Sequence, residues 1–170
     1  DGHLDFLAIR PALARPVALG RGVLDCVRET KAPFSTTACV EEFAQVLRWY
    51  RCASFQSDRY AGDWPKEAFR NVGLECRLSD YTKSEYYLNL LPLLTGARCE
   101  LLDLPRLHAQ LLGLERRTTR NGRDVVDHAP RAHDDLANAC AGALVLATRA
   151  ARFAVGRCSW TGWYEPDASP

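Results

Sequence analysis

A chain of 170 residues is long enough to form one domain with a substantial hydrophobic core. Its apolar and charged fractions, 47% and 25%, are those of a globular protein and exclude a disordered or fibrous one. The net charge of +1 neither requires nor excludes a nucleic-acid partner.

Strand-like and helix-like segments alternate along the chain. Short apolar runs predict strands, and apolar residues at helical spacing predict helices. In chain order we expect strands over 5–9 and 22–27, a helix over 40–50, a strand over 53–57, a helix over 63–73, a strand over 74–78, a helix over 82–94, a strand over 98–102, and helices over 105–117 and 134–152.

This order predicts an α/β domain with a mixed sheet flanked by helices. The stretch between the first two strands is rich in proline, arginine and glycine, and we expect a loop there. We also expect a polar loop over 116–123 and a loose tail over 153–170, which leaves one domain over 1–152.

Several functions are excluded by what the sequence lacks. No basic leader with an apolar core is present, and the longest apolar stretch, Leu136–Ala147, is too short to span a bilayer, so we expect no membrane partner. The seven cysteines form no CxxC pair, which predicts reduced thiols in a cytosolic protein and no zinc site. No phosphate-binding loop of the Walker type occurs, and the absence of methionine suggests a piece of a longer protein.

Two segments that bear aspartate, far apart in the sequence, are the main candidates for a site. Asp58 directly follows a predicted strand, and ligand sites in α/β sheets collect beyond strand carboxyl ends. Asp134 and Asp135 open the last predicted helix. If the fold brings these acids together, they form an oxygen-rich pocket that suits Mg²⁺ or Mn²⁺ and phosphoryl chemistry.

Each candidate also has a simpler interpretation. Asp58 alone is typical of a turn, and Asp134 with Asp135 is typical of a helix N-cap, although one cap needs only one carboxylate. His128 and His133 are candidates for a metal or a phosphate, or for hydrogen bonding to the acids. Arginines that could meet phosphates in succession, or form a solvated loop, are Arg116, Arg117, Arg120 and Arg123.

Several of these segments, in this order, resemble one known family. They are Ser57–Pro65, Thr82–Glu85, Leu111–Arg117, Gly122–Asp124 with Asp127–Pro130, and Ala132–Ala139. Together they are similar to the C-terminal nuclease domain of the terminase large subunit of tailed phages and prophages, over about residues 5–150.

The resemblance implies a ribonuclease-H-like fold and a divalent-metal endonuclease that cuts phage DNA during genome packaging. Asp58 matches the acid of the central strand, and Asp134 and Asp135 match the late acidic pair. The first-strand acid has no clear counterpart, since Asp5 fits an accessory position better, so we expect the first strand to be truncated. The 170 residues also contain no counterpart of the family's ATPase half.

We therefore predict two Mg²⁺ or Mn²⁺ ions about 4 Å apart, bound by Asp58, Asp134 and Asp135 with help from Asp5. The expected partners are double-stranded DNA, with the phage small terminase subunit and portal as further candidates, in the cytoplasm of a bacterial host. One alternative is a catalytically inactive prophage remnant that binds DNA or packaging partners. Another is a different ribonuclease-H-like nuclease, such as a junction resolvase.

Overall fold

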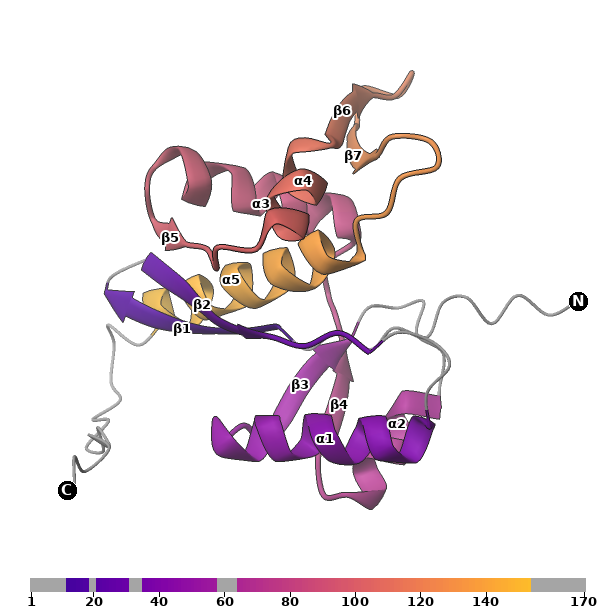
Figure 1. The fold of residues 1–170 in the computed structure, drawn as a ribbon. Helices are drawn as coiled ribbons and strands as arrows, with labels where there is room; N and C mark the ends of the chain where they lie inside the picture. Colours follow the sequence, from indigo (N-terminus) through magenta and orange to yellow (C-terminus); the bar gives the residue numbers. More distant parts are fainter. Residues whose placement is uncertain (1–11, 19–20, 31–34, 58–63, 154–170) are drawn as a thin grey trace, which may run out of the picture.

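The structure, a computed structural model, describes residues 12–18, 21–30, 35–57 and 64–153. Its strands and helices alternate along most of the chain (Figure 1). They are β1 Ala12–Ala18, β2 Arg21–Val27, α1 Thr36–Trp49, β3 Ser54–Ser57, α2 Trp64–Asn71, β4 Glu75–Leu78, α3 Lys83–Thr95, β5 Cys99–Glu100, α4 Pro105–Leu112, β6 Leu114–Thr118, β7 Asp124–His128 and α5 Asp135–Phe153.

The described strands pair in three groups. β2 lies between β1, with which it pairs antiparallel, and β5, with which it pairs parallel. β3 and β4 form a parallel pair, and β6 and β7 form an antiparallel hairpin. The predicted mixed α/β architecture is thus confirmed, with short sheets.

Two hydrophobic clusters stabilise the described chain. The larger cluster packs α3, α4 and α5 together and includes Leu24 of β2, Leu90 and Leu144. The smaller one packs α1 and α2 onto β3 and β4 around Phe43 and Phe69. Figure 1 shows the two groups on opposite sides of the β1–β2 ribbon.

Local capping explains where the helices begin. The Thr82 hydroxyl accepts a hydrogen bond from the Glu85 N–H, and the Glu85 carboxylate accepts one from the Thr82 N–H, which is the predicted capping box. Ser35 caps α1 by accepting from the N–H of Ala38 at 3.4 Å. These interactions span only three residues, so the sequence alone reveals them.

The stretch predicted as the first loop contains a strand. Residues 12–18 form β1, whose only described neighbour is β2. Pro16 has no N–H to donate, but an edge strand tolerates a proline, and the register shifts beside it. The prediction of a loop there was therefore wrong. The strand predicted over 5–9 lies outside the described residues.

The predictions over 105–123 were also wrong in part. The helix ends at Leu112 instead of Arg117, and Gly113 follows it as C-cap. Residues 114–118 then pair with 124–128 instead of forming a loop, and the turn between them places Gly122 at a φ of 72°. The strand residues are mostly polar because this hairpin is largely exposed, so no apolar alternation announces it.

Two further expectations concern the cysteines and the membrane. All six described cysteines are free thiols, and burial raises the pKa of Cys140 to about 12, which makes this thiol unreactive. Cys158 lies outside the described residues. Among the helices that the structure describes, none has the length and apolar character needed to cross a bilayer.

Candidate metal centre

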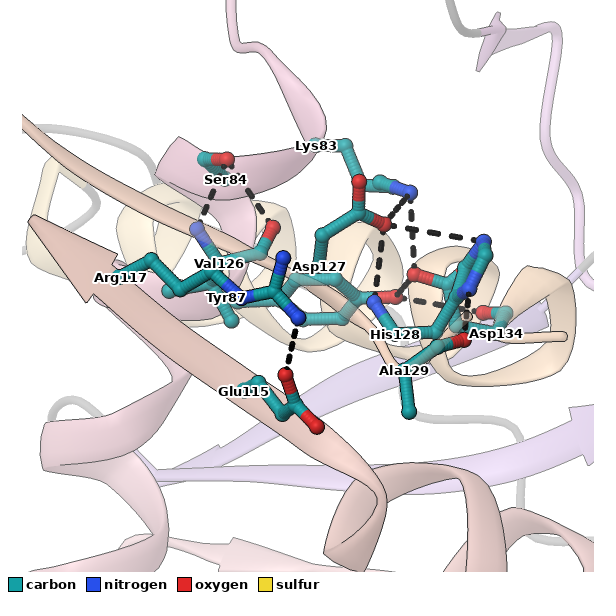
Figure 2. A network of polar contacts seen from close by, with 10 residues as sticks. All are labelled: Lys83, Ser84, Tyr87, Glu115, Arg117, Val126, Asp127, His128, Ala129 and Asp134. Atoms are coloured by element: carbon teal, nitrogen blue, oxygen red, sulfur yellow. Dashed lines mark hydrogen bonds and ion pairs between the residues drawn. The ribbon is translucent and has the colours of Figure 1, made fainter. Parts of the chain in front are cut away.

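Three potential metal ligands converge at the start of α5. Asp127 and His128 end β7, and Asp134 immediately precedes α5. One ligand atom from each of the three lies within 4.8 Å of the others. Figure 2 shows these side chains facing one another beside Lys83 of α3.

Asp134 is the buried member of this cluster, with only 4% of its surface exposed. The Tyr87 hydroxyl donates to Asp134 Oδ2 at 2.9 Å, and the Lys83 ammonium lies 3.2 Å from the same oxygen. Burial, followed by the negative charge of Asp134, raises the pKa of Tyr87, so this phenol remains a hydrogen-bond donor at any ordinary pH. A buried carboxylate is costly unless it is paired in this way.

His128 has a defined tautomer when it is neutral. Its Nδ1 lies 2.8 Å from the carbonyl oxygen of Ala129, and since a carbonyl only accepts, Nδ1 carries the hydrogen. The Nε2 lone pair is then available, and Nε2 lies 3.7 Å from Asp127 Oδ1 and 3.9 Å from Asp134 Oδ1. A hydrogen-bonded Nδ1 with a free Nε2 is the usual arrangement of a histidine that binds metal.

Lys83 places a positive charge between the two carboxylates. Its Nζ lies 2.5 Å from Asp127 Oδ1 and 3.2 Å from Asp134 Oδ2. Burial opposes the charge on Lys83, but the hydrogen bonds and charges of the two aspartates outweigh it and raise the pKa of Lys83. The hydrogen bond from Lys83 in turn lowers the pKa of Asp127. The carboxylate of Asp127 is therefore ionised at neutral pH.

This donor set fits a divalent cation. Two carboxylates and one imidazole nitrogen are ligands that Mn²⁺ accepts, and the carboxylates also suit Mg²⁺. One turn after Asp134, the amide oxygen of Asn138 is buried and has no hydrogen-bond partner among the described residues. Such an orphaned oxygen is costly unless water or a ligand reaches it.

The predicted acids fall in different places. Asp134 belongs to the cluster, whereas Asp135 is the exposed first residue of α5 and is not one of the three clustered ligands. Asp58 and Asp5 lie outside the described residues.

β3, the strand that precedes Asp58, is hydrogen-bonded to α3. Gln56 Oε1 accepts a hydrogen bond from the Tyr86 hydroxyl at 3.3 Å. The convergence of Asp58 with Asp134 remains a prediction.

Three residues of the candidate metal centre were not predicted from the sequence. Asp127, Lys83 and Tyr87 stand within or next to the segments that carried the family resemblance, but no local pattern distinguishes them from surface or core residues. His128 was one of two ambiguous histidines. The only hint in the sequence was that Asp127 and His128 lie a few residues before Asp134. His133, the other histidine, is exposed and lines a cavity of about 280 Å³ together with His128 and Gln110.

The four arginines predicted to bind DNA lie on the β6–β7 hairpin. Arg116 forms an ion pair with Asp124, and Arg117 forms one with Glu115 (Figure 2 shows the second). Arg120 and Arg123 lie at the turn, and their guanidinium groups have no ion-pair partner among the described residues. The hairpin thus presents arginines of two kinds, paired and available.

Comparison with known proteins identifies the fold as that of a nuclease domain. No family model and no curated protein matches the sequence. Among solved structures, the chain has the ribonuclease-H-like fold of phage large terminase nuclease domains, as the resemblance predicted.

Structures of two such nuclease domains match the chain. One is the large terminase nuclease from thermophilic phage G20c, which matches with a TM-score of 0.62 and 16% identity over 81% of each chain; the form with bound magnesium matches equally well over 82% of each chain. The other is the nuclease domain of the large terminase subunit of bacterial virus Sf6 with manganese, with a TM-score of 0.50 and 13% identity over 82% of this chain and 87% of that one.

Proposed function

We propose that the chain is a divalent-metal-dependent endonuclease domain that hydrolyses phosphodiester bonds of double-stranded phage DNA. The observation that carries this proposal is the buried Asp134 carboxylate within 4.8 Å of Asp127 and His128, in the fold of terminase nuclease domains. Genome packaging in the cytoplasm of a bacterial host, with the small terminase subunit and the portal as partners, is the setting that the family resemblance suggests.

Asp134, Asp127 and His128 would hold a cation, with Asp58, Asp135 and Asp5 as further ligands of a two-ion site. A bound Mg²⁺ or Mn²⁺ supplies a stabilising charge at the scissile phosphate and an activated water. The protein's own task is to hold its ligands in position. Tyr87 holds Asp134 in place, and Ala129 orients His128. The hairpin arginines would position the DNA backbone.

Cleavage of a supercoiled plasmid in Mn²⁺ tests this function. We expect Asp134→Asn and Asp58→Asn to lower the cleavage rate at least about a hundredfold, because each removes a charge from the ligand set while keeping its shape. Glu41→Gln, which neutralises an exposed acid on α1, should cut like wild type. Equal cutting by all of these proteins would refute the site.

One observation favours the catalytically inactive alternative. Lys83 already neutralises Asp127 and Asp134 without any metal. If this pairing is the final state, the chain binds DNA in a salt-sensitive way but cuts none at any Mn²⁺ concentration. A metal titration of both binding and cleavage therefore separates the two functions. A strong preference for four-way junctions over linear duplex would instead indicate a junction resolvase.

A further inference from the structure

The backbone of Asp134 forms the N-cap of α5. Its carbonyl accepts the first helical hydrogen bond, from the N–H of Asn138 at 2.8 Å. The first N–H groups of a helix have no partner within it, and an aspartate at the N-cap ordinarily accepts from the second or third of them with its own side chain. In α5 these groups belong to Leu136 and Ala137.

A residue from another helix takes over this capping task. The N–H of Ala137 donates to Oε1 of Gln110, on α4, at 3.0 Å. Since an N–H only donates, the atom that faces it is the amide oxygen, which defines the orientation of the Gln110 side chain. α4 and α5 pack in the same hydrophobic cluster, through Leu107 among others, so this contact is built into the fold.

The carboxylate of Asp134 consequently interacts with residues other than the helix N–H groups. Among the described residues its partners are Tyr87, Lys83 and His128, and Ala137 is not one of them. The start of a helix attracts negative charge, so an uncapped Ala137 N–H would compete for this carboxylate. With Gln110 in place, the carboxylate faces the other ligands.

We propose that Gln110 is a positioning residue for the metal centre: by capping α5, it leaves the side chain of Asp134 to the cation. This inference rests on the proposed function, because it assumes that Asp134 binds a metal. It adds a residue whose side chain acts through Asp134.

Calorimetric titration of the full chain with Mn²⁺ tests the proposal. Gln110→Met keeps the length of the side chain but removes the acceptor, and we expect it to weaken Mn²⁺ binding about tenfold. Gln110→Glu retains the acceptor and should bind Mn²⁺ at least as well as wild type. Ser35→Ala is the matched control, because it removes the side-chain acceptor of the corresponding N–H at the start of α1. It should lower thermal stability and leave Mn²⁺ affinity unchanged.

The outcomes are distinguishable. If wild type binds Mn²⁺ and Gln110→Met binds it equally well, Gln110 has only a structural role and the inference falls while the proposed function stands. If wild type binds no Mn²⁺, both fall. A crystal structure of Gln110→Met gives a readout without metal: the Asp134 carboxylate should have turned to accept from Ala137 N–H, and an unmoved carboxylate would overturn the proposal.

Discussion

Asp127 and Lys83 form a partly exposed ion pair in the candidate metal centre, and their charges make the stability of the fold depend on pH. The folded-state pKa of Asp127 is lowered, so its contribution to stability is present above the unfolded pKa of about 3.9 and is lost as pH falls through the folded value. The pKa of Lys83 is raised, so its contribution is present below about 10.4 and is lost as pH rises through the folded value. The pair therefore stabilises the fold between these limits.

Asp127→Asn should reveal this window. We expect the variant to be less stable than wild type by under about 1 kcal/mol at neutral pH, because the Asp127 side chain is 53% exposed and solvent screens the pair. The difference should shrink below about pH 4, where wild type loses the charge as well. Urea denaturation from pH 2.5 to pH 9 measures it. A difference that stays constant down to pH 2.5 would contradict the assignment of this ion pair.

The β6–β7 hairpin carries the four arginines predicted to bind DNA, and two of them already form ion pairs. The guanidinium groups of Arg116 and Arg117 are already paired with carboxylates on the same hairpin, so binding to phosphate would have to break those pairs. Arg120 and Arg123 at the turn have no ion-pair partner among the described residues, so they could bind phosphate without breaking an ion pair. The turn should therefore carry most of the electrostatic contact with DNA.

Paired substitutions compare the two kinds of arginine. Arg120→Gln with Arg123→Gln should reduce the slope of log affinity against log salt by about 1.8, since each lost phosphate contact removes about 0.9. Arg116→Gln with Arg117→Gln should reduce it less. Fluorescence anisotropy with a labelled duplex in EDTA, across a range of NaCl, measures both slopes without cleavage. If the substitution of Arg116 and Arg117 reduces the slope more than that of Arg120 and Arg123, the turn is not the main contact with DNA.

Across the whole molecule, the candidate metal centre depends on one of the two hydrophobic clusters. Tyr87, Val126 and Leu136, which adjoin or form the centre, all belong to the cluster around α5. β3, which leads to Asp58, packs through Phe55 against the other cluster. A site that joins Asp58 to Asp134 would therefore connect the two clusters. The hydrogen bond from the Tyr86 hydroxyl to Gln56 Oε1 at 3.3 Å already links β3 to the α5 cluster.

Leu144 tests the importance of the α5 cluster. It has no exposed surface, and Leu144→Ala should lower the free energy of unfolding by about 2–5 kcal/mol through lost burial and a cavity. Leu112→Ala is the matched control, since Leu112 is 86% exposed and its loss should change stability little. Urea denaturation at pH 7 measures both. A loss below about 1 kcal/mol for Leu144→Ala would show that this cluster is loosely packed.

Much of the fold was predictable because its signals are local. Helix starts such as Thr82 with Glu85 depend on hydrogen bonds between residues three apart, and these appear directly in the sequence. The same holds for the α/β class, which follows from the alternation of strands and helices. The hairpin was missed because its exposed strands are mostly polar, and β1 was missed because Arg15 and Pro16 interrupt its apolar run.

The sequence by itself therefore determined the class of fold, the order of most elements and Asp134 as a candidate ligand. Only the tertiary structure decided which side chains surround Asp134. Tyr87 lies 47 positions before it, and Lys83 lies 44 positions before its partner Asp127. Contacts over such separations depend on how α3 and α5 pack across the core, and packing leaves no periodic mark in the sequence.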